Sequence, residues 1–489
     1  MGTRDIFEIT HRDSAGRIGR LTTPHGIVET PAIMPVINPN IQTIPAKEMK
    51  DLGARILITN SYIIYRKPEL KQRAIEEGVH ALLGFDGPVM TDSGSFQLSV
   101  YGQVEVDNAG IIGFQHAIGT DIGVPLDIPT SPAADHEQAA QELVVTNQRL
   151  MEALELNKGS GMLLAAPVQG GTHTDLREQA GRELGRAGFD IYPIGAVVPL
   201  MESYRYAELV DVIVSAKKGL PSSVPVHLFG AGHPMVFALA TALGCDLFDS
   251  AAYALYARDA RYLTAEGTFH IQDLKYLPCS CPICSSHTAA EIMSHPDRTE
   301  LLARHNLFAT FAEMRLVKQA ICDGNLWELV ERRARIHPRM LDGLKRAVTH
   351  AGWLEQFDPS TKSTFFYCGP ESTYRPEVLR WGNRLERIEL TGTVLIRPDG
   401  RLKNESAYNT VLHFKPPFGA YPLELKETYP LNAEVPVVAD HESLTNALLN
   451  TKKLMQLNPD AEFSFVYRRS WDHPLVEEIC RMASHSWSV

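Results

Sequence analysis

Three aspartates, each at or near the end of a short apolar run, are the side chains of this sequence best placed for chemistry. Asp92 ends "PVMTD", Asp127 lies in "VPLDIP" and Asp249 lies in "CDLFDS". A single aspartate in such a place is most often a helix cap or a turn former. Three of them, with the amide of Gln169 after a fourth run, are hard to explain in that way. Paired carboxylates suit nucleophilic and acid–base chemistry, as in retaining glycosidases.

Parallel strands are the elements that would bring these side chains together. Over the first 260 residues, short apolar runs alternate with helix-like segments, which is typical of parallel βα units. The runs are AIMPVIN, ARILITN, PVMTD, IGVPLDI, MLLAAPVQG, DIYPIGAVV, PVHLFGAG and DLFDS. Eight such units in about 250 residues predict an α/β fold, a (β/α)8 TIM barrel. The alternative, an open doubly wound sheet, would have a glycine-rich phosphate-binding turn, and these turns have none.

The carboxyl ends of barrel strands meet on one face, where the active site of such a barrel is built. The residues at or near these ends are Asn60, Asp92, Asp127, Gln169, Gly195, Gly230 and Asp249. The longest helix-like segment follows Ser131, which is predicted to cap it, with Pro132 in the first turn.

A cluster of cysteines predicts a metal site. Cys279, Cys281 and Cys284 have C-x-C-x-x-C spacing in "PCSCPICSSH", and thiolates this close suit tetrahedral zinc. The fourth ligand could be His287 or His305. Four protein ligands leave no open coordination position, so we expect one structural Zn²⁺ that holds an insertion onto the barrel.

Composition limits the class of protein. A chain of 489 residues predicts two to four domains. The formal net charge of −11 argues weakly against nucleic-acid binding, although residues 331–348 are locally basic. The chain has an odd number of cysteines, a charged start and no long apolar run, which together predict a cytoplasmic protein without membrane contact.

Three motifs resemble the tRNA-guanine transglycosylases: TDSGSFQ, GCDLFDS, and CSCPIC followed by HNL. Their order and spacing match that family from roughly residue 5 to residue 350. The segment FFYCGPESTYRPEVLRWGNRL is similar to a C-terminal region of the archaeal branch that the shorter bacterial enzymes lack. The resemblance implies replacement of guanine at position 15 of the tRNA D-arm with 7-cyano-7-deazaguanine (preQ0), the first tRNA-level step of archaeosine biosynthesis.

The resemblance also implies catalytic roles. Asp249 would be the nucleophile that holds the ribose C1′ in a covalent intermediate while the bases exchange. Asp92 would be the general acid/base, which protonates departing guanine and accepts a proton from the incoming base. His305, which opens "HNL", would be the fourth zinc ligand.

Base recognition would fall to other strand ends. Asp127 could accept hydrogen bonds from the ring N–H and the amino group of guanine, a pattern that adenine does not offer. Gln169 and the backbone near Gly195 could donate to the carbonyl oxygen of the base. Phe96 could stack on the flipped base, although core packing would explain it as well.

The segment "IGAVVPL" bears on which base enters. Bacterial enzymes, which use an aminomethyl base, have a similar segment that ends in an acid, and Leu200 stands where that acid would fall. A neutral cyano group prefers an apolar slot, which we expect Val197 and Val198 to line.

Three domains are expected: a TIM-barrel catalytic domain at 1–274, a zinc-binding subdomain with the final barrel helices at 275–350, and an α+β region of one or two small modules at 351–489. The expected partners are tRNA, guanine, preQ0 and a second copy of the chain. Full-length archaeal enzymes also carry an RNA-binding PUA domain, which this chain is not expected to contain, so a separate PUA-domain protein is a further expected partner.

Three alternatives stay open. A paralogue that binds tRNA without exchanging bases would have lost an acid, whereas Asp92, Asp127 and Asp249 are all present. The related archaeosine synthase lacks this cysteine cluster. A retaining glycoside hydrolase would need several aromatic platforms, and aromatic residues make up only 8% of the chain and do not cluster at the strand ends.

Overall fold

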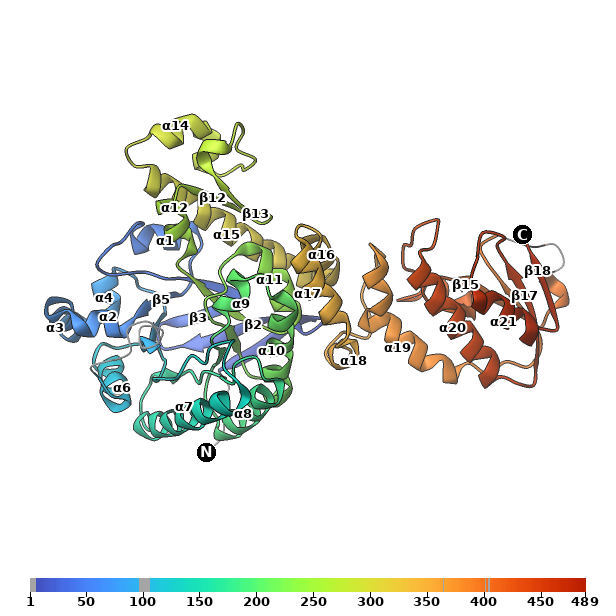
Figure 1. The fold of residues 1–489 in the computed structure, drawn as a ribbon, viewed down its shortest axis with the longest axis horizontal. Helices are drawn as coiled ribbons and strands as arrows, with labels where there is room; N and C mark the ends of the chain where they lie inside the picture. Colours follow the sequence, from blue (N-terminus) through green and yellow to red (C-terminus); the bar gives the residue numbers. More distant parts are fainter. Residues whose placement is uncertain (1–5, 96–105, 364, 401, 403–404) are drawn as a thin grey trace. The chain divides into compact units, whose positions relative to one another are not determined.

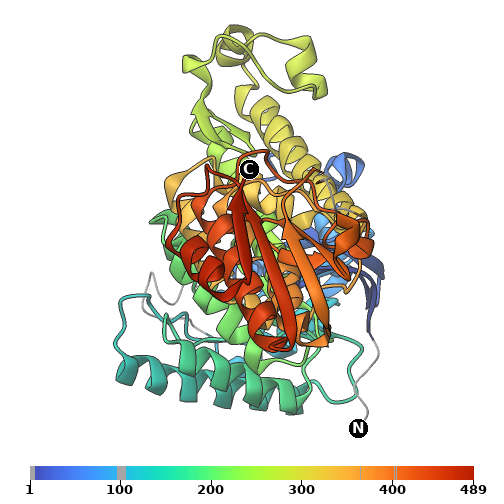
Figure 2. The same ribbon diagram turned by 90° about the vertical axis from the view of Figure 1, so that its right-hand side faces the viewer.

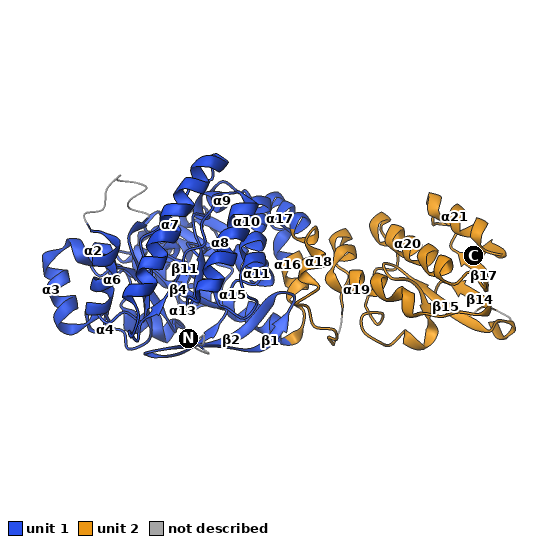
Figure 3. Ribbon diagram, turned by 90° about the horizontal axis from the view of Figure 1, so that it is seen from below, with its two compact units in different colours: residues 1–322, 332–346 blue, residues 323–331, 347–489 orange. Residues whose placement is uncertain are grey.

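The computed structural model describes residues 6–95, 106–363, 365–400, 402 and 405–489 (Figure 1). The chain forms two compact units, of which unit 1 comprises 1–322 and 332–346, and unit 2 comprises 323–331 and 347–489 (Figure 3). The expected three-part division at residues 274 and 350 concerns finer boundaries and stays a prediction.

Unit 1 is an α/β structure with two four-stranded parallel sheets, as expected for the fold class. One sheet has, in order, β5 (Leu57–Asn60), β6 (Val89–Asp92), β7 (Ile122–Gly123) and β8 (Leu163–Leu164). The other has, in order, β4 (Ala32–Pro35), β11 (Leu247–Ser250), β10 (Val226–Leu228) and β9 (Tyr192–Ile194). Each of the eight apolar runs therefore contains one strand.

Isolated parallel bridges join residues of one sheet to residues of the other. Val36, directly after β4, pairs with Ile58 of β5. Val168, beyond β8, pairs with Ile194 of β9. Backbone pairing therefore continues past the edge of each sheet.

An antiparallel sheet of β1 (Phe7–Asp13), β2 (Gly16–Thr23) and β3 (Gly26–Thr30) packs at the amino ends of the parallel strands. Two contacts fix it there: Arg17 pairs with Asp246, directly before β11, and His25 bonds to Asp121, directly before β7. Its side chains Leu21 and Val28 are fully buried in the same cluster as those of the parallel strands. The opposite, carboxyl ends of the strands are thus left for the predicted site.

The connecting helices lie around these strands (Figure 1). They are α1 (Ala46–Leu52), α2 (Ser61–Arg66), α3 (Pro68–Glu77), α4 (Val79–Leu83), α6 (Asn108–Ala117), α7 (His136–Leu156), α8 (Thr174–Ala187), α9 (Val198–Glu202), α10 (Tyr206–Gly219), α11 (Pro234–Ala242) and α12 (Ala252–Arg258). Within the described segments, no helix combines the length and the apolar character needed to traverse a lipid bilayer.

The prediction of Ser131 as the cap of the long helix is wrong. The helix, α7, begins at His136, and the side chain of Asp135 accepts a hydrogen bond from the Gln138 N–H at 2.9 Å. Ser131 Oγ accepts from the Ala133 N–H in the turn before it. Asp135 is the better cap because it immediately precedes the first turn, whose free N–H groups need an acceptor.

An insertion follows α12 and projects from the rest of unit 1 (Figures 1 and 2). It consists of β12 (Arg261–Thr264), β13 (Gly267–His270), α13 (Pro282–Ser286) and α14 (Ala289–Ser294), and it leads into α15 (Arg298–Asp323). The helices α16 (Leu326–Ala334) and α17 (Pro338–Val348) come next.

Unit 2 is built on a five-stranded sheet of order β16-β15-β14-β17-β18, whose strands lie side by side in Figure 2. The strands are β14 (Gly392–Arg397), β15 (Thr410–Lys415), β16 (Gly419–Pro422), β17 (Ala461–Tyr467) and β18 (His485–Ser488). The helices are α18 (Ala351–Leu354), α19 (Pro376–Arg384), α20 (His441–Leu457) and α21 (Pro474–Met482). Trp381, Phe414 and Phe465 belong to its own buried core.

Candidate active site

The carboxyl ends of three strands hold the three predicted acids. Asp92 is the last residue of β6, Asp249 lies one residue before the end of β11, and Asp127 follows β7. Asn60, at the end of β5, has an ordinary local role, because its side chain caps α2 by accepting from the Ile63 N–H at 2.8 Å. Asn60 is therefore a structural cap, and the three aspartates remain the candidate active-site residues at the strand ends.

The pKa of Asp92 lies well above its usual range. Its Oδ1 accepts a hydrogen bond from the Gly94 N–H at 2.8 Å. Part of the residue stays accessible to solvent, yet protein atoms surround the carboxylate closely, and this burial raises the pKa of Asp92 to about 7. Repulsion from Asp249 and Asp127 also raises the pKa of Asp92, whereas the Gly94 hydrogen bond opposes the rise, so Asp92 lies within electrostatic reach of both other carboxylates.

The turn after Asp92 depends on glycine. Gly94 has a φ of +80°, and a Cβ atom there would lie 2.6 Å from the Cβ of Tyr62. No larger residue fits this place without moving Tyr62. The tight turn is what lets the Gly94 N–H point back at the Asp92 carboxylate.

Asp249 is buried and held through one oxygen only. Its Oδ1 accepts from the Gly230 N–H at 2.7 Å and from Nε2 of His227 at 2.8 Å. Among the residues that the structure describes, its Oδ2 has no hydrogen-bond partner. The carboxylate therefore has a fixed orientation and one oxygen available for bonding.

Asp127, Gln169 and Gly195 form one contact group. Nε2 of Gln169 donates to Oδ2 of Asp127 at 2.7 Å. A Cβ atom on Gly195 would lie 2.3 Å from that same Nε2, so only glycine leaves room for the amide. Burial raises the pKa of Asp127, although hydrogen bonds from Ser95 and Gln169 oppose it.

Val198 lies beside the backbone that holds Asp249, whereas Val197 is fully buried just before α9. A Cβ atom on Gly230 would come within 2.3 Å of Cγ2 of Val198. Leu200 is buried as well, so the segment presents apolar side chains and no acid. Phe96, the expected stacking residue, lies outside the described residues.

Two further residues of the site were not expected from the sequence. Arg177 of α8 is fully buried and donates to the carbonyl oxygens of Gly195 at 2.9 Å, Gly171 at 2.8 Å and Val168. Burial lowers the pKa of Arg177 to about 9. His227 of β10 is fully buried against Asp249, and an imidazole inside an apolar strand was the available signal for it.

The predicted cysteines come together with a histidine. Donor atoms of Cys279, Cys281, Cys284 and His305 all lie within 4.8 Å of one another. Nδ1 of His305 is 3.5 Å from Sγ of Cys281 and 3.3 Å from Sγ of Cys284. This group can hold a metal ion, as the spacing of the cysteines predicted.

His305, and not His287, completes the group. The Nε2 of His305 bonds to the carbonyl oxygen of Leu263 at 2.9 Å, which leaves Nδ1 facing the sulfurs. The ring of Tyr262 stacks on the ring of His305, with centroids 3.7 Å apart. His287 instead has its Nδ1 on the carbonyl oxygen of Ile283. Such outer contacts fix the ring orientation of a metal ligand.

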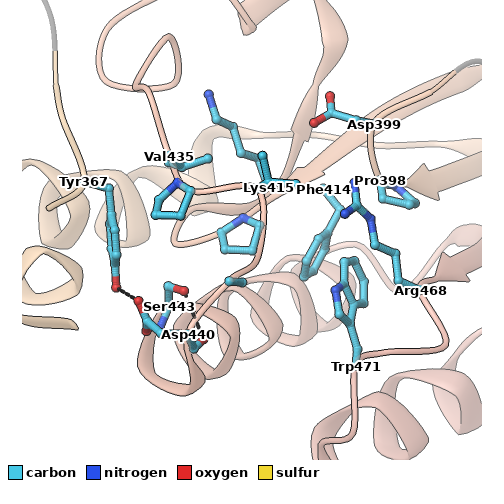
Figure 4. Close-up of a pocket in the computed structure, with 14 residues that line it drawn as sticks. Tyr367, Pro398, Asp399, Phe414, Lys415, Val435, Asp440, Ser443, Arg468 and Trp471 are labelled. Atoms are coloured by element: carbon cyan, nitrogen blue, oxygen red, sulfur yellow. Dashed lines mark hydrogen bonds between the residues drawn. The ribbon is translucent and has the colours of Figure 1, made fainter. Parts of the chain in front are cut away.

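A separate cavity of about 210 Å³ lies in unit 2, and Figure 4 shows side chains that line it. The rings of Phe414 and Trp471 lie 4.6 Å apart in its wall, beside Arg468. Its described lining includes none of the predicted site residues, which all belong to unit 1.

Residues 13–339 match the sequence model of the family described as queuine tRNA-ribosyltransferase. The chain belongs to this family. The resemblance expected from the three motifs is therefore confirmed, and the three acids and the cysteine cluster fall within the matched range.

Similar proteins of this family are called tRNA-guanine(15) transglycosylase. The one from Methanosarcina barkeri is 63% identical over 478 residues, which cover 98% of this chain and 97% of the relative. That from Haloarcula marismortui is 52% identical over 94% of each chain. That from Archaeoglobus fulgidus is 50% identical over 95% of this chain and 96% of its own length.

Proposed function

We propose that this chain is a tRNA-guanine(15) transglycosylase that replaces guanine with preQ0 in tRNA. The relatives support the activity, because they match nearly the whole chain and share that name. The observation that carries the chemistry is the arrangement of Asp92 and Asp249. One acid has a pKa near neutrality, and the other has a fixed carboxylate with a free oxygen.

The proposed reaction has two displacements at the ribose C1′. In the first, Oδ2 of Asp249 forms a bond to C1′, the bond from C1′ to N9 of guanine breaks, and protonated Asp92 gives its proton to the departing base. In the second, the incoming preQ0 loses its N9 proton to Asp92, its N9 bonds to C1′, and the Asp249 carboxylate is released. No water is consumed, and Asp92 ends in its starting state.

Guanine recognition is proposed for the Asp127 group. The base must leave the stack of the tRNA to reach the acids. Asp127 can accept from the ring N–H and the amino group, and Gln169 braces Asp127 through its amide. Arg177 holds the Gly195 carbonyl, which fixes the backbone beside Gln169. Phe96 is proposed to cover the base.

The cyano group of preQ0 is proposed to lie against Val198, with Val197 behind it. The absence of an acid in the described segment from Ala196 to Leu200 supports this, because a neutral cyano group could not neutralise a buried carboxylate.

We infer that the two parallel sheets of unit 1 close into the expected (β/α)8 barrel. The bridges Val36–Ile58 and Val168–Ile194 support closure, because they lie at both places where the sheets meet in chain order. Closure would set the carboxyl ends of all strands in one ring.

Zinc is the ion that fits the group of Cys279, Cys281, Cys284 and His305. Three soft sulfurs and an imidazole match its tetrahedral preference, and four protein donors leave no position for substrate. Its role is structural, to hold the insertion that carries α13 and α14. Elemental analysis should find one zinc per chain, and His305→Ala should lose it while His287→Ala keeps it.

Label exchange tests the function. The protein is incubated with unmodified archaeal tRNA and radiolabelled guanine or preQ0, and the label in tRNA is measured. Incorporation is expected with wild-type tRNA and none with a transcript in which position 15 is adenine. No incorporation into the wild-type tRNA by the wild-type protein would contradict the proposal.

The resemblance also leads us to propose a cytoplasmic homodimer and a separate PUA-domain partner. Light scattering at several concentrations tests the dimer. A pull-down from an archaeal lysate tests the partner, and recovery of no PUA-containing protein would count against it.

A further inference from the structure

We propose that His227 is a positioning residue for Asp249: its imidazole N–H fixes Oδ1 so that Oδ2 faces the ribose. This inference rests on the proposed role of Asp249 as nucleophile. No motif of the sequence pointed to His227, and its role follows from the contacts it makes in the folded chain.

The contact between the two side chains is short and buried. Nε2 of His227 lies 2.8 Å from Oδ1 of Asp249, and the histidine is 0% exposed. The Gly230 N–H reaches the same oxygen at 2.7 Å. Two donors therefore converge on Oδ1 and leave Oδ2 without one among the described residues. A hydrogen bond to a charged group is stronger and more directional than a neutral one.

The other ring nitrogen defines the form of the imidazole. Nδ1 of His227 is buried and has no hydrogen-bond partner in the described part of the chain. A protonated imidazole would place a second N–H there without an acceptor, which is costly in a buried site. The neutral tautomer with its proton on Nε2 satisfies the contact to Asp249. His227 therefore acts as a fixed donor and does not exchange protons with substrate.

Packing holds the ring in place. Phe229 lies against His227 with ring centroids 4.4 Å apart at an interplanar angle of 57°. Phe229 and Gly230 come two and three residues after His227, so one strand end supplies the donor, its packing partner and the second N–H. An ordinary core histidine would need none of this alignment with the nucleophile.

Three variants test the role. His227→Phe keeps a ring but removes the donor, His227→Asn shortens the side chain so that its amide reaches only the place of Nδ1, and His227→Gln carries its amide N–H as many bonds from Cα as Nε2. We expect the Phe and Asn variants to lower kcat for guanine exchange about 100-fold, as misplacement of a reacting group does. The KM for guanine should change less than about twofold, because base binding is left intact.

The Gln variant is the rescue. It should keep kcat within about tenfold of wild type, because a donor still reaches Oδ1. Its pH profile should keep the wild-type midpoints, since the amide of Gln replaces one N–H donor to Oδ1 with another. A matched control is His80→Phe, which removes another histidine that bonds an aspartate, Asp121, at 2.8 Å. That variant should lower the melting temperature and leave kcat unchanged.

The outcomes separate the two proposals. If the wild-type protein does not exchange guanine, the proposed function fails. If it does, and the Phe and Asn variants keep kcat within about threefold, or the Gln variant is as impaired as they are, the role of His227 is overturned. Circular dichroism shows which variants fold, and if the Phe variant does not, the comparison of Asn with Gln decides.

Discussion

Aspartates at the amino ends and at the carboxyl ends of the same parallel strands differ in how their carboxylates are hydrogen-bonded. At the amino ends, Asp246 accepts two hydrogen bonds from Arg17, both 2.7 Å, and one from the Val226 N–H. At the carboxyl end of the same strand, Asp249 has both of its donors on one oxygen.

The strand β7 repeats the contrast. Burial would raise the pKa of Asp121, before the strand, but hydrogen bonds from His80, Val89 and His25 outweigh burial and lower it. After the strand, burial prevails and the pKa of Asp127 is raised. Acids at the amino ends therefore stabilise the fold, while those at the carboxyl ends are held in states that chemistry can use.

The largest expected effect is on the proposed nucleophile. Asp249→Asn keeps the size of the side chain and removes the oxygen proposed to attack C1′, so guanine incorporation into tRNA should fall by at least about 10⁴-fold. The melting temperature should not fall. Incorporation within about tenfold of wild type would break the assignment of Asp249.

The amino-end acids should give the opposite result. Asp246→Ala leaves the buried guanidinium of Arg17 without its partner, so the free energy of unfolding should fall by about 3–5 kcal/mol. The kcat of the folded fraction should be unchanged. Urea titration measures the free energy of unfolding, and guanine-exchange assays at low temperature measure kcat. A large loss of kcat with full stability would contradict the structural role of the amino-end acids.

The pH dependence of activity and stability should distinguish Asp92 from Asp121. Because the pKa of Asp92 is raised to about 7, formation of the covalent intermediate, which needs the protonated acid, should decline as pH rises through about 7. Asp92→Asn should lower exchange by about 10²–10⁴-fold below pH 7, and the difference from wild type should narrow as pH rises above 7.

Stability should change with opposite sign at the two acids. Because the pKa of Asp92 is raised in the fold, stability should fall as pH rises from the unfolded pKa of about 3.9 to about 7 and stay low above it. Asp92→Asn should therefore raise the melting temperature at pH 8 relative to wild type and change it little at pH 4. The lowered pKa of Asp121 stabilises the fold above its unfolded pKa, and this is lost as pH falls. Asp121→Asn should therefore lower the melting temperature at pH 8. If both variants shifted the melting temperature in the same direction at pH 8, the proposed difference between the two acids would be contradicted.

The smallest expected effect is at Gly195. A methyl group there would lie 2.3 Å from Nε2 of Gln169 and displace the amide from Asp127. Gly195→Ala should raise the KM for guanine about tenfold and leave kcat within about threefold, because the acids that transfer the base are untouched. Steady-state kinetics measure both constants. The control is Gly188→Ala, at the C-cap of α8, where the backbone is in the left-handed region but a Cβ atom would meet open space.

Much of this arrangement could be predicted from the sequence. Apolar runs that end in Asp92 or Asp249 indicated both a strand and an acid at its carboxyl end, and the spacing of the cysteines indicated a metal group. Spacing alone left His287 and His305 open, the family resemblance implied His305, and the fold shows that its ring faces the sulfurs.

The roles of other residues could not be assigned from the local sequence. Asp121 and Asp127 lie six residues apart in the sequence and look alike, and only their partners separate them. Arg177 donates hydrogen bonds to backbone carbonyl oxygens, which every residue has, so no sequence motif predicts its contacts. His227 becomes meaningful only when Asp249, 22 residues later, is seen beside it.

The most direct measurement is to trap and locate the covalent intermediate. Wild-type protein mixed with tRNA is denatured, and the protein–tRNA band is isolated, digested and mapped by mass spectrometry. We expect a ribose-linked peptide whose modified residue is Asp249, and no such band from Asp249→Asn. A band that persists in Asp249→Asn, or a linkage that maps to another residue, would contradict this expectation.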